Sequence, residues 1–158
     1  AKEADETPRG VIVQDTAWDG YEEIPAWIMQ GYGTMAMEAG EQLKAQGCER
    51  PTHIFVQAGV GSLAGAVVGY FSNLYADNLP TFVVVEAEAA ACLYKGAAAG
   101  ESGAAPFGAL AAMMTMDEYK DLRNDIGLDE NSKVLLFSTE GDTDPDRYKN
   151  IVWKGLDK

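Results

Sequence analysis

The chain has 158 residues and a formal net charge of −13 at pH 7, and it combines 47% hydrophobic with 23% charged residues, as folded domains do. A chain of this length buries about 68–70% of its unfolded surface, so we expect residues 1–158 to form a single domain with a hydrophobic core. The excess of acidic residues disfavours a nucleic acid or an anionic membrane as partner, because both repel a polyanion. No apolar run reaches the roughly 18 residues that span a bilayer, and the first residues are unlike a signal peptide, so we expect a cytoplasmic protein.

The side chains that usually hold metal ions are scarce. The chain has two cysteines, Cys48 and Cys92, and a single histidine, His53. These are too few and too far apart for a zinc site or a disulfide framework, and we expect both cysteines to be free structural thiols. Aspartates alternate at 142, 144 and 146 as in a calcium loop, but the glycine and glutamate that such a loop needs are missing. We therefore expect no metal cofactor.

Four short runs rich in Val, Ile and Phe predict strands, at residues 10–14, 52–57, 81–86 and 133–137. Helices are predicted between and after them, at residues 21–46, 62–75, 87–95, 106–116 and 145–154. Strands that are apolar on both faces and alternate with helices are typical of a parallel sheet covered by helices on each face. The sequence therefore predicts an α/β fold with three layers, α/β/α, in which ligands bind at the carboxyl ends of the strands.

Two further segments carry local signals. In the long helix predicted at 21–46, Pro25 suits the first turn, and Gly47 is a natural residue to end the helix. Residues 96–105 are nearly all Ala and Gly. That composition predicts either a flexible surface connection or a junction between segments that are not adjacent in a parent protein.

Residues 59–65, Gly-Val-Gly-Ser-Leu-Ala-Gly, follow a predicted strand and open a predicted helix. Such glycines let backbone N–H groups approach an anion, and the helix start adds partial positive charge, so a phosphate is the natural ligand. The same residues satisfy the dinucleotide pattern G-x-G-x-x-A, in which Glu86 would hold a ribose hydroxyl, although it lies further along the chain than the usual spacing of about 20 residues. A tight turn that only packs a helix on a strand is the third interpretation, and the pattern leaves all three open.

Asp15 follows the first predicted strand and precedes Trp18. A carboxylate beside an aromatic ring in a partly dry cleft can have its pKa raised toward neutrality, and it can then serve as a general acid or base. The alternative is a turn or N-cap residue for the following helix, which is the interpretation that the sequence alone favours.

Four motifs, taken together and in this order, resemble the diaminopropionate ammonia-lyases. They are Val-Ile-Val-Gln-Asp-Thr-Ala-Trp-Asp-Gly-Tyr at 11–21, Ile-Pro-Ala-Trp-Ile-Met-Gln-Gly-Tyr at 24–32, Gln-Ala-Gly-Val-Gly-Ser-Leu-Ala-Gly at 57–65 and Ser-Thr-Glu-Gly-Asp-Thr-Asp at 138–144. That family uses pyridoxal 5'-phosphate and has the tryptophan-synthase-β fold, fold type II. The stretch that begins at Glu101 also resembles the Glu-x-Ser-Gly-Ala turn of related dehydratases.

The resemblance implies a set of roles. The phosphate-binding residues would be Gly59, Val60, Gly61, Ser62 and Leu63. Ser138 would hydrogen-bond the pyridine nitrogen of the cofactor, and Asp15 would handle the Cα proton or the ammonium group of the substrate. The implied reaction is α,β-elimination of 2,3-diaminopropionate to pyruvate and ammonia, and members of the family are cytoplasmic homodimers that act on a small amino acid.

The chain also departs from the family pattern. None of its eight lysines stands in the Ser-x-Lys-x-Arg-like context of the Schiff-base lysine, which the family carries in an N-terminal segment. The sequence therefore predicts a C-terminal portion of a lyase that lacks the lysine part, with a second gap near residues 96–100 and no turnover by itself. The alternatives are a nicotinamide-dinucleotide-binding, Rossmann-like domain and an inert fragment.

Overall fold

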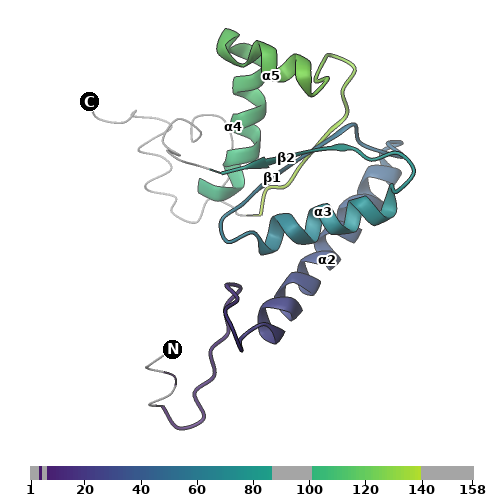
Figure 1. Ribbon diagram of the computed structural model, residues 1–158. Helices are drawn as coiled ribbons and strands as arrows, with labels where there is room; N and C mark the ends of the chain where they lie inside the picture. Colours follow the sequence, from purple (N-terminus) through teal and green to yellow (C-terminus); the bar gives the residue numbers. More distant parts are fainter. Residues whose placement is uncertain (1–3, 5–6, 87–100, 140–158) are drawn as a thin grey trace, which may run out of the picture.

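The computed structural model describes residue 4 and residues 7–86 and 101–139, and its centre is a three-stranded parallel sheet. The strands are β1 (His53–Gln57), β2 (Thr81–Val85) and β3 (Val134–Leu136), and their order across the sheet is β2-β1-β3 (Figure 1). His53 pairs with Thr81 on one side and with Val134 on the other, so all three strands start level. The strands predicted at 52–57, 81–86 and 133–137 are confirmed, and so is the parallel sheet.

Helices lie on both faces of this sheet (Figure 1). The long helix α2 (Glu23–Ala45) packs against α3 (Ser62–Leu74), and α3 contacts β1. The other face is covered by α4 (Glu101–Thr115), and the short helices η2 (Asp117–Tyr119) and α5 (Lys120–Asp125) pack beside it. The predicted three-layer α/β/α arrangement is confirmed.

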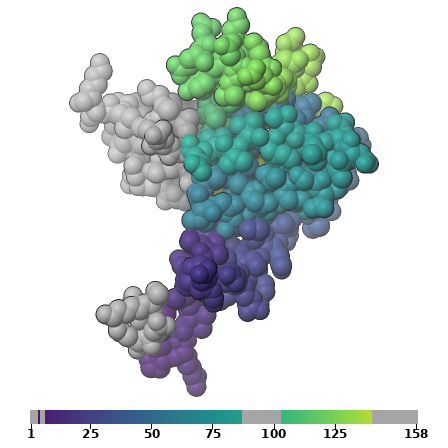
Figure 2. Space-filling model, in the orientation of Figure 1, coloured from purple at the N-terminus to yellow at the C-terminus, as the bar shows by residue number. Residues whose placement is uncertain are grey.

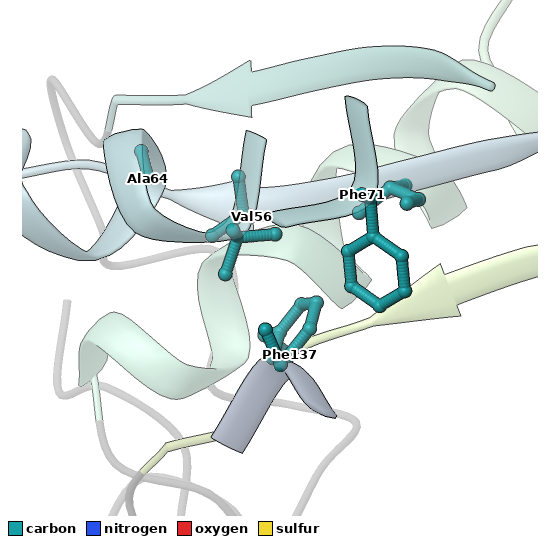
Figure 3. Packing of buried hydrophobic residues seen from close by; sticks show 7 residues of the cluster. Val56, Ala64, Phe71 and Phe137 are labelled. Carbon is teal, nitrogen blue, oxygen red and sulfur yellow. The ribbon is translucent and has the colours of Figure 1, made fainter. Parts of the chain in front are cut away.

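Side chains of β1 alternate between two hydrophobic clusters, one on each face of the sheet. Ile54 and Val56, both fully buried, face α3, where they meet a cluster that includes Phe71 and Phe137 (Figure 3). Phe55 points to the other face and packs with residues of α4 and of the segment before β3. Because successive side chains of a strand point to opposite faces, a run with no polar residue is what a central strand covered on both sides requires.

Helix α2 ends just before Gly47, as the sequence predicted. Gly47 has a φ of +75°, the left-handed conformation that a glycine adopts without a Cβ penalty. Its N–H donates to the carbonyl of Lys44 at 2.9 Å, and the next N–H, of Cys48, donates to the carbonyl of Leu43 at 2.9 Å. Two carbonyl groups that the helix leaves unpaired are thereby satisfied, which ends α2 and turns the chain toward β1.

The strand predicted at residues 10–14 is wrong. This segment has no regular structure, and Val11 and Val13 are 72% and 70% exposed. Residues 7–22, to which this segment belongs, extend below the body of the molecule (Figures 1 and 2). A β-branched run becomes a strand only where a neighbouring strand pairs with it, and no described strand lies beside this one.

Helix α4 begins earlier than predicted, at Glu101 rather than Pro106. Pro106 lies inside the helix and lacks the N–H that would bond to the previous turn. Ala104, Ala105 and Pro106 are all buried, so packing against the sheet compensates for the missing bond. The helices predicted at 87–95 and 145–154, the proposed junction at 96–100, Cys92 and the alternating aspartates lie outside the described residues.

Candidate functional site

The glycine loop, residues 59–63, connects the carboxyl end of β1 to the first turn of α3. The N–H of Ala58 still pairs with β2, donating to the carbonyl of Val85 at 3.0 Å, and the chain then leaves the sheet. Gly61 is the N-cap of α3 and has a φ of +97°, where any other residue would be strained. A Cβ built on Gly59 or Gly61 would meet no atom within 4 Å, so the space in front of the loop is open.

The start of α3 is electrostatically suited to an anion. The first N–H groups of a helix have no partner within it and carry partial positive charge. No side chain of the described residues caps α3, and its first turn contains no acidic residue. In contrast, α2 has Glu23 in its first turn. The start of α3 therefore presents backbone N–H groups that nothing on its own turn neutralises.

A cavity of about 200 Å³, called the loop cavity from here on, lies against this loop. Most residues to which the sequence assigned a role line it, namely Asp15, Gly59, Val60, Gly61, Ser62 and Leu63. Ser138 does not line it and is exposed, whereas its neighbour Thr139 does. The structure thus brings six of the seven predicted residues to one space, while their individual roles remain predictions.

Asp15 reaches the loop through a direct hydrogen bond. The hydroxyl of Ser62 donates to the backbone carbonyl of Asp15 at 3.0 Å. The residues just before Asp15 are held by Tyr21, whose hydroxyl donates to the carbonyl of Ile12 at 2.9 Å and accepts from the N–H of Gln14 at 3.0 Å. Two side chains from later in the chain therefore fix the irregular segment that carries Asp15.

Trp18 is not part of the Asp15 environment that the sequence suggested. Its ring stacks on the ring of Tyr21, with centroids 4.1 Å apart, and it is 41% exposed. Trp18 and Tyr21 are paired by backbone hydrogen bonds across a tight turn in which Gly20 has a φ of +83°. This turn directs Trp18 onto Tyr21, and Trp18 lines neither the loop cavity nor the larger groove described next.

A larger groove of about 880 Å³ runs between α2 and α3. Asp15, Val60, Gly61 and Ser62 line this groove as well as the loop cavity. Its remaining lining is mostly apolar and small, and a Cβ added at Gly65 would lie 3.8 Å from Cε of Met29. Asp15 therefore lies between the loop cavity and the larger groove, beside the first turn of α3.

The structure adds one pair that the sequence reasoning missed. Gln57, the last residue of β1, lines the loop cavity and is 7% exposed. Its Nε2–H donates to Oγ1 of Thr139 at 2.8 Å, while its Oε1 is buried and has no hydrogen-bond partner among the described residues. A polar residue at the end of an otherwise apolar strand, directly before a glycine loop, was the signal that could have found it.

Two other acidic residues lie elsewhere. Glu86, which the dinucleotide interpretation needs, is exposed just after β2 and does not line the loop cavity. Glu101, at the start of the stretch that resembles a dehydratase turn, is the first residue of α4. In the described part of the chain, no three His, Cys, Asp or Glu side chains gather in a way that could hold a metal ion, and no helix there is long and apolar enough to cross a membrane.

Comparison with known families shows the family to which the chain belongs and the cofactor of that family. Residues 1–135 match the family described as pyridoxal-phosphate dependent enzyme. The chain belongs to this family. The cofactor of the family is thus the phosphate ester that the glycine loop suggested, and the dinucleotide interpretation gains no support.

Within this family the chain is similar to diaminopropionate ammonia-lyases. It is 37% identical to that of Salmonella typhimurium over 217 residues, which cover 95% of this chain and 54% of the relative. It is 32% identical to that of Escherichia coli over 208 residues, covering 91% of this chain and 52% of the relative. The chain thus spans about half the length of these relatives.

Solved structures agree in fold. The apo form of Escherichia coli diaminopropionate ammonia-lyase superposes with a TM-score of 0.78 at 37% identity, covering 90% of this chain and 48% of that one. The same enzyme in complex with an aminoacrylate–PLP azomethine reaction intermediate superposes with a TM-score of 0.77 at 33% identity, covering 91% and 52%. The fold-type-II prediction is confirmed by this likeness.

The residues of the loop cavity fit the family's cofactor. Open space in front of Gly59 and Gly61 leaves room for a phosphate, and the uncapped start of α3 supplies donors for it. The unpartnered amide oxygen of Gln57 shows that a polar group of the cavity still lacks its partner.

Proposed function

We propose that this chain is the phosphate-binding portion of a diaminopropionate ammonia-lyase, which converts 2,3-diaminopropionate to pyruvate and ammonia with pyridoxal 5'-phosphate as cofactor. The observation that carries this proposal is the uncapped, acid-free start of α3 behind Gly61, in a chain that belongs to a pyridoxal-phosphate family. Bound pyridoxal phosphate supplies an electron sink for the negative charge that develops on the substrate.

Each site residue then has a defined task. Backbone N–H groups of residues 59–63 bind the phosphate, because a dianion is stabilised by the partial positive charge at a helix start. The Ser62 hydroxyl fixes the segment of Asp15. The carboxylate of Asp15 handles the proton at the substrate Cα or the substrate ammonium, and the hydroxyl of Ser138 hydrogen-bonds the pyridine nitrogen.

We propose that the complete enzyme is a cytoplasmic homodimer and that its catalytic lysine lies outside these 158 residues. The resemblance to the family supports this, as does the share of about half of each relative that the chain covers. An alignment of 217 positions is also longer than this chain of 158 residues, which supports a stretch omitted relative to the Salmonella typhimurium enzyme, and from the sequence we place that stretch near 96–100. The high negative charge supports a small-molecule substrate over a nucleic acid or a membrane.

The experiment measures binding of pyridoxine 5'-phosphate, which has the ring and phosphate of the cofactor but no aldehyde. Pyridoxal phosphate itself would react with surface lysines, of which the chain has eight in all. Calorimetric titration is expected to show one site, and Gly61→Asp should abolish it by placing a carboxylate at the mouth of the loop. Gly31→Asp, the same change at an exposed glycine of α2, is the matched control and should bind as the parent does.

A pyruvate assay with 2,3-diaminopropionate complements the titration. The chain alone should form no pyruvate, because no lysine in the expected context is present to hold the cofactor. A titration that shows no binding, or binding that survives Gly61→Asp, would contradict the proposed phosphate site. Pyruvate formation by these residues alone would contradict the proposed need for a lysine from elsewhere.

A further inference from the structure

Gln57 is a buried polar side chain at the end of an otherwise apolar stretch of β1. The three residues before it in β1, Ile54, Phe55 and Val56, are fully buried and apolar, and Gln57 itself is only 7% exposed. A glutamine side chain offers two N–H donors and an acceptor oxygen, and a buried amide is costly unless these groups find partners. The position therefore has to be explained by what the amide binds.

The amide of Gln57 has one partner, at the point where β1 and β3 separate. Backbone pairing between β1 and β3 ends with the N–H of Phe137, which donates to the carbonyl of Phe55 at 3.4 Å. Two residues further along each strand, Nε2–H of Gln57 donates to Oγ1 of Thr139 at 2.8 Å. The side chain of Gln57 thus continues the connection between the two strands after their backbones separate.

The other end of the same amide finds no partner in the described part of the chain. Oε1 of Gln57 is buried and makes no hydrogen bond with any described residue. Because the hydroxyl of Thr139 can donate as well as accept, turning the amide by half a rotation would satisfy Oε1 and leave Nε2 unpartnered instead. In either orientation one buried polar atom of Gln57 remains available to a further group.

The location of this atom points to that group. Gln57 and Thr139 both line the loop cavity, together with the glycine loop and Asp15. Thr139 also directly follows Ser138, the residue assigned to the pyridine nitrogen. A contact that fixes Thr139 therefore fixes the backbone that carries Ser138.

We infer that Gln57 is a positioning residue of the cofactor site, which ties the end of β3 to β1 and thereby fixes the backbone that carries Ser138. Its remaining amide atom forms its hydrogen bond only when a ligand with a ring occupies the loop cavity. This inference rests on the proposed function. It assigns the phosphate to the backbone of residues 59–63 and the alignment of the ring to the pair formed by Gln57 and Thr139.

The test compares two probes, pyridoxine 5'-phosphate and inorganic phosphate, with the 158-residue chain and its variants. Gln57→Met keeps the length of the side chain and removes its hydrogen bonds, and Thr139→Val removes the partner hydroxyl at nearly constant shape. Both should weaken pyridoxine 5'-phosphate by about tenfold or more and leave inorganic phosphate unchanged. Thr139→Ser, which keeps the hydroxyl, should restore binding, and Gln42→Met on the exposed side of α2 is the matched control.

Urea unfolding without ligand supplies the second measurement. Gln57→Met removes a buried atom that lacks a partner, but it also removes the hydrogen bond to Thr139, so the two effects on stability oppose each other and the cofactor-free variant should unfold close to the parent. A variant that loses stability and weakens both probes equally would show a purely structural role and overturn the inference. If the parent binds pyridoxine 5'-phosphate and Gln57→Met binds it equally well, the inference falls and the proposed function stands. If the parent does not bind it, the proposed function fails, and the inference fails with it.

Discussion

The hydroxyl of Ser62, in the first turn of α3, donates a hydrogen bond to the backbone carbonyl of Asp15 at 3.0 Å, across 47 positions of the sequence. A serine hydroxyl has a single proton, so while it donates to Asp15 it cannot donate to a second acceptor. The capacity of the glycine loop to bind an anion therefore depends on its backbone N–H groups, and the serine side chain serves to hold the segment of the candidate acid or base.

Ser62→Ala should release that segment. The hydrogen bond is the side-chain contact that joins Asp15 to α3, so its loss should increase amide hydrogen exchange in residues 11–21, measured by mass spectrometry. The free energy of unfolding should fall by only about 0.5–1.5 kcal/mol, since one hydrogen bond is lost. Ser72→Ala, the same change later in α3, should leave this exchange unaltered. Unchanged exchange in Ser62→Ala would show that Tyr21 alone fixes the segment.

Gly61→Ala should destabilise the protein although it causes no clash. Nothing lies within 4 Å of a Cβ at this position, but the φ of +97° is costly for alanine, by about 1–2 kcal/mol. Gly31→Ala, at an exposed glycine of α2 that also has open space around it, should instead stabilise by about 0.5–1 kcal/mol through helix propensity. Urea unfolding of the two variants measures both shifts, and equal shifts of one sign would contradict this account.

The sequence correctly predicted two kinds of element: those marked by a few neighbouring residues, and strands that are covered by helices on both faces. The glycine loop, the end of α2 at Gly47 and the three apolar strands each follow from a few neighbouring residues. The strand at 10–14 failed because pairing depends on a neighbour that no local pattern contains. The early start of α4 was missed because Pro106 signals a helix start, while burial of the residues before it decided the boundary.

In the candidate site, too, contacts between neighbouring residues could be predicted from the sequence and contacts between distant residues could not. Six of the predicted residues line one cavity because five of them are consecutive in the glycine loop and the hydroxyl of Ser62 holds Asp15 beside it. The bond between Gln57 and Thr139 joins residues 82 positions apart, and it depends on the register of β1 and β3, which the sequence does not state. Trp18 was assigned to the environment of Asp15 from sequence proximity, but the turn at Gly20 directs it to Tyr21.

Tyr75 should make the protein sensitive to alkaline pH. Burial raises the pKa of its hydroxyl above the usual value of about 10, with smaller contributions from Cys48, Tyr70 and Glu49. The folded state therefore releases this proton at higher pH than the unfolded state, and stability that is complete below pH 10 is lost as the pH rises toward the folded pKa.

Removing the hydroxyl tests this directly. The hydroxyl is buried and has no hydrogen-bond partner within residues 7–86 and 101–139, so Tyr75→Phe should maintain or raise stability at neutral pH and keep the stacking on Phe71, whose ring centroid is 5.9 Å away. Urea unfolding between about pH 8 and 11 should show a smaller loss of stability in the variant than in the parent. Equal losses in both proteins would assign the alkaline effect to other groups.

Phe71 should be among the largest single contributors to stability. It is fully buried in α3 and meets Phe137, which directly follows β3, at a centroid distance of 6.3 Å, so it joins the helix layer to the sheet (Figure 3). Phe71→Ala should lower the free energy of unfolding by about 3–5 kcal/mol, because it removes buried surface and leaves a cavity. Phe107→Ala, the same change at a side chain of α4 that is 44% exposed, should cost less than about 1 kcal/mol. Comparable losses in the two variants would mean that the layers of α2 and α3 are not held on the sheet by this cluster.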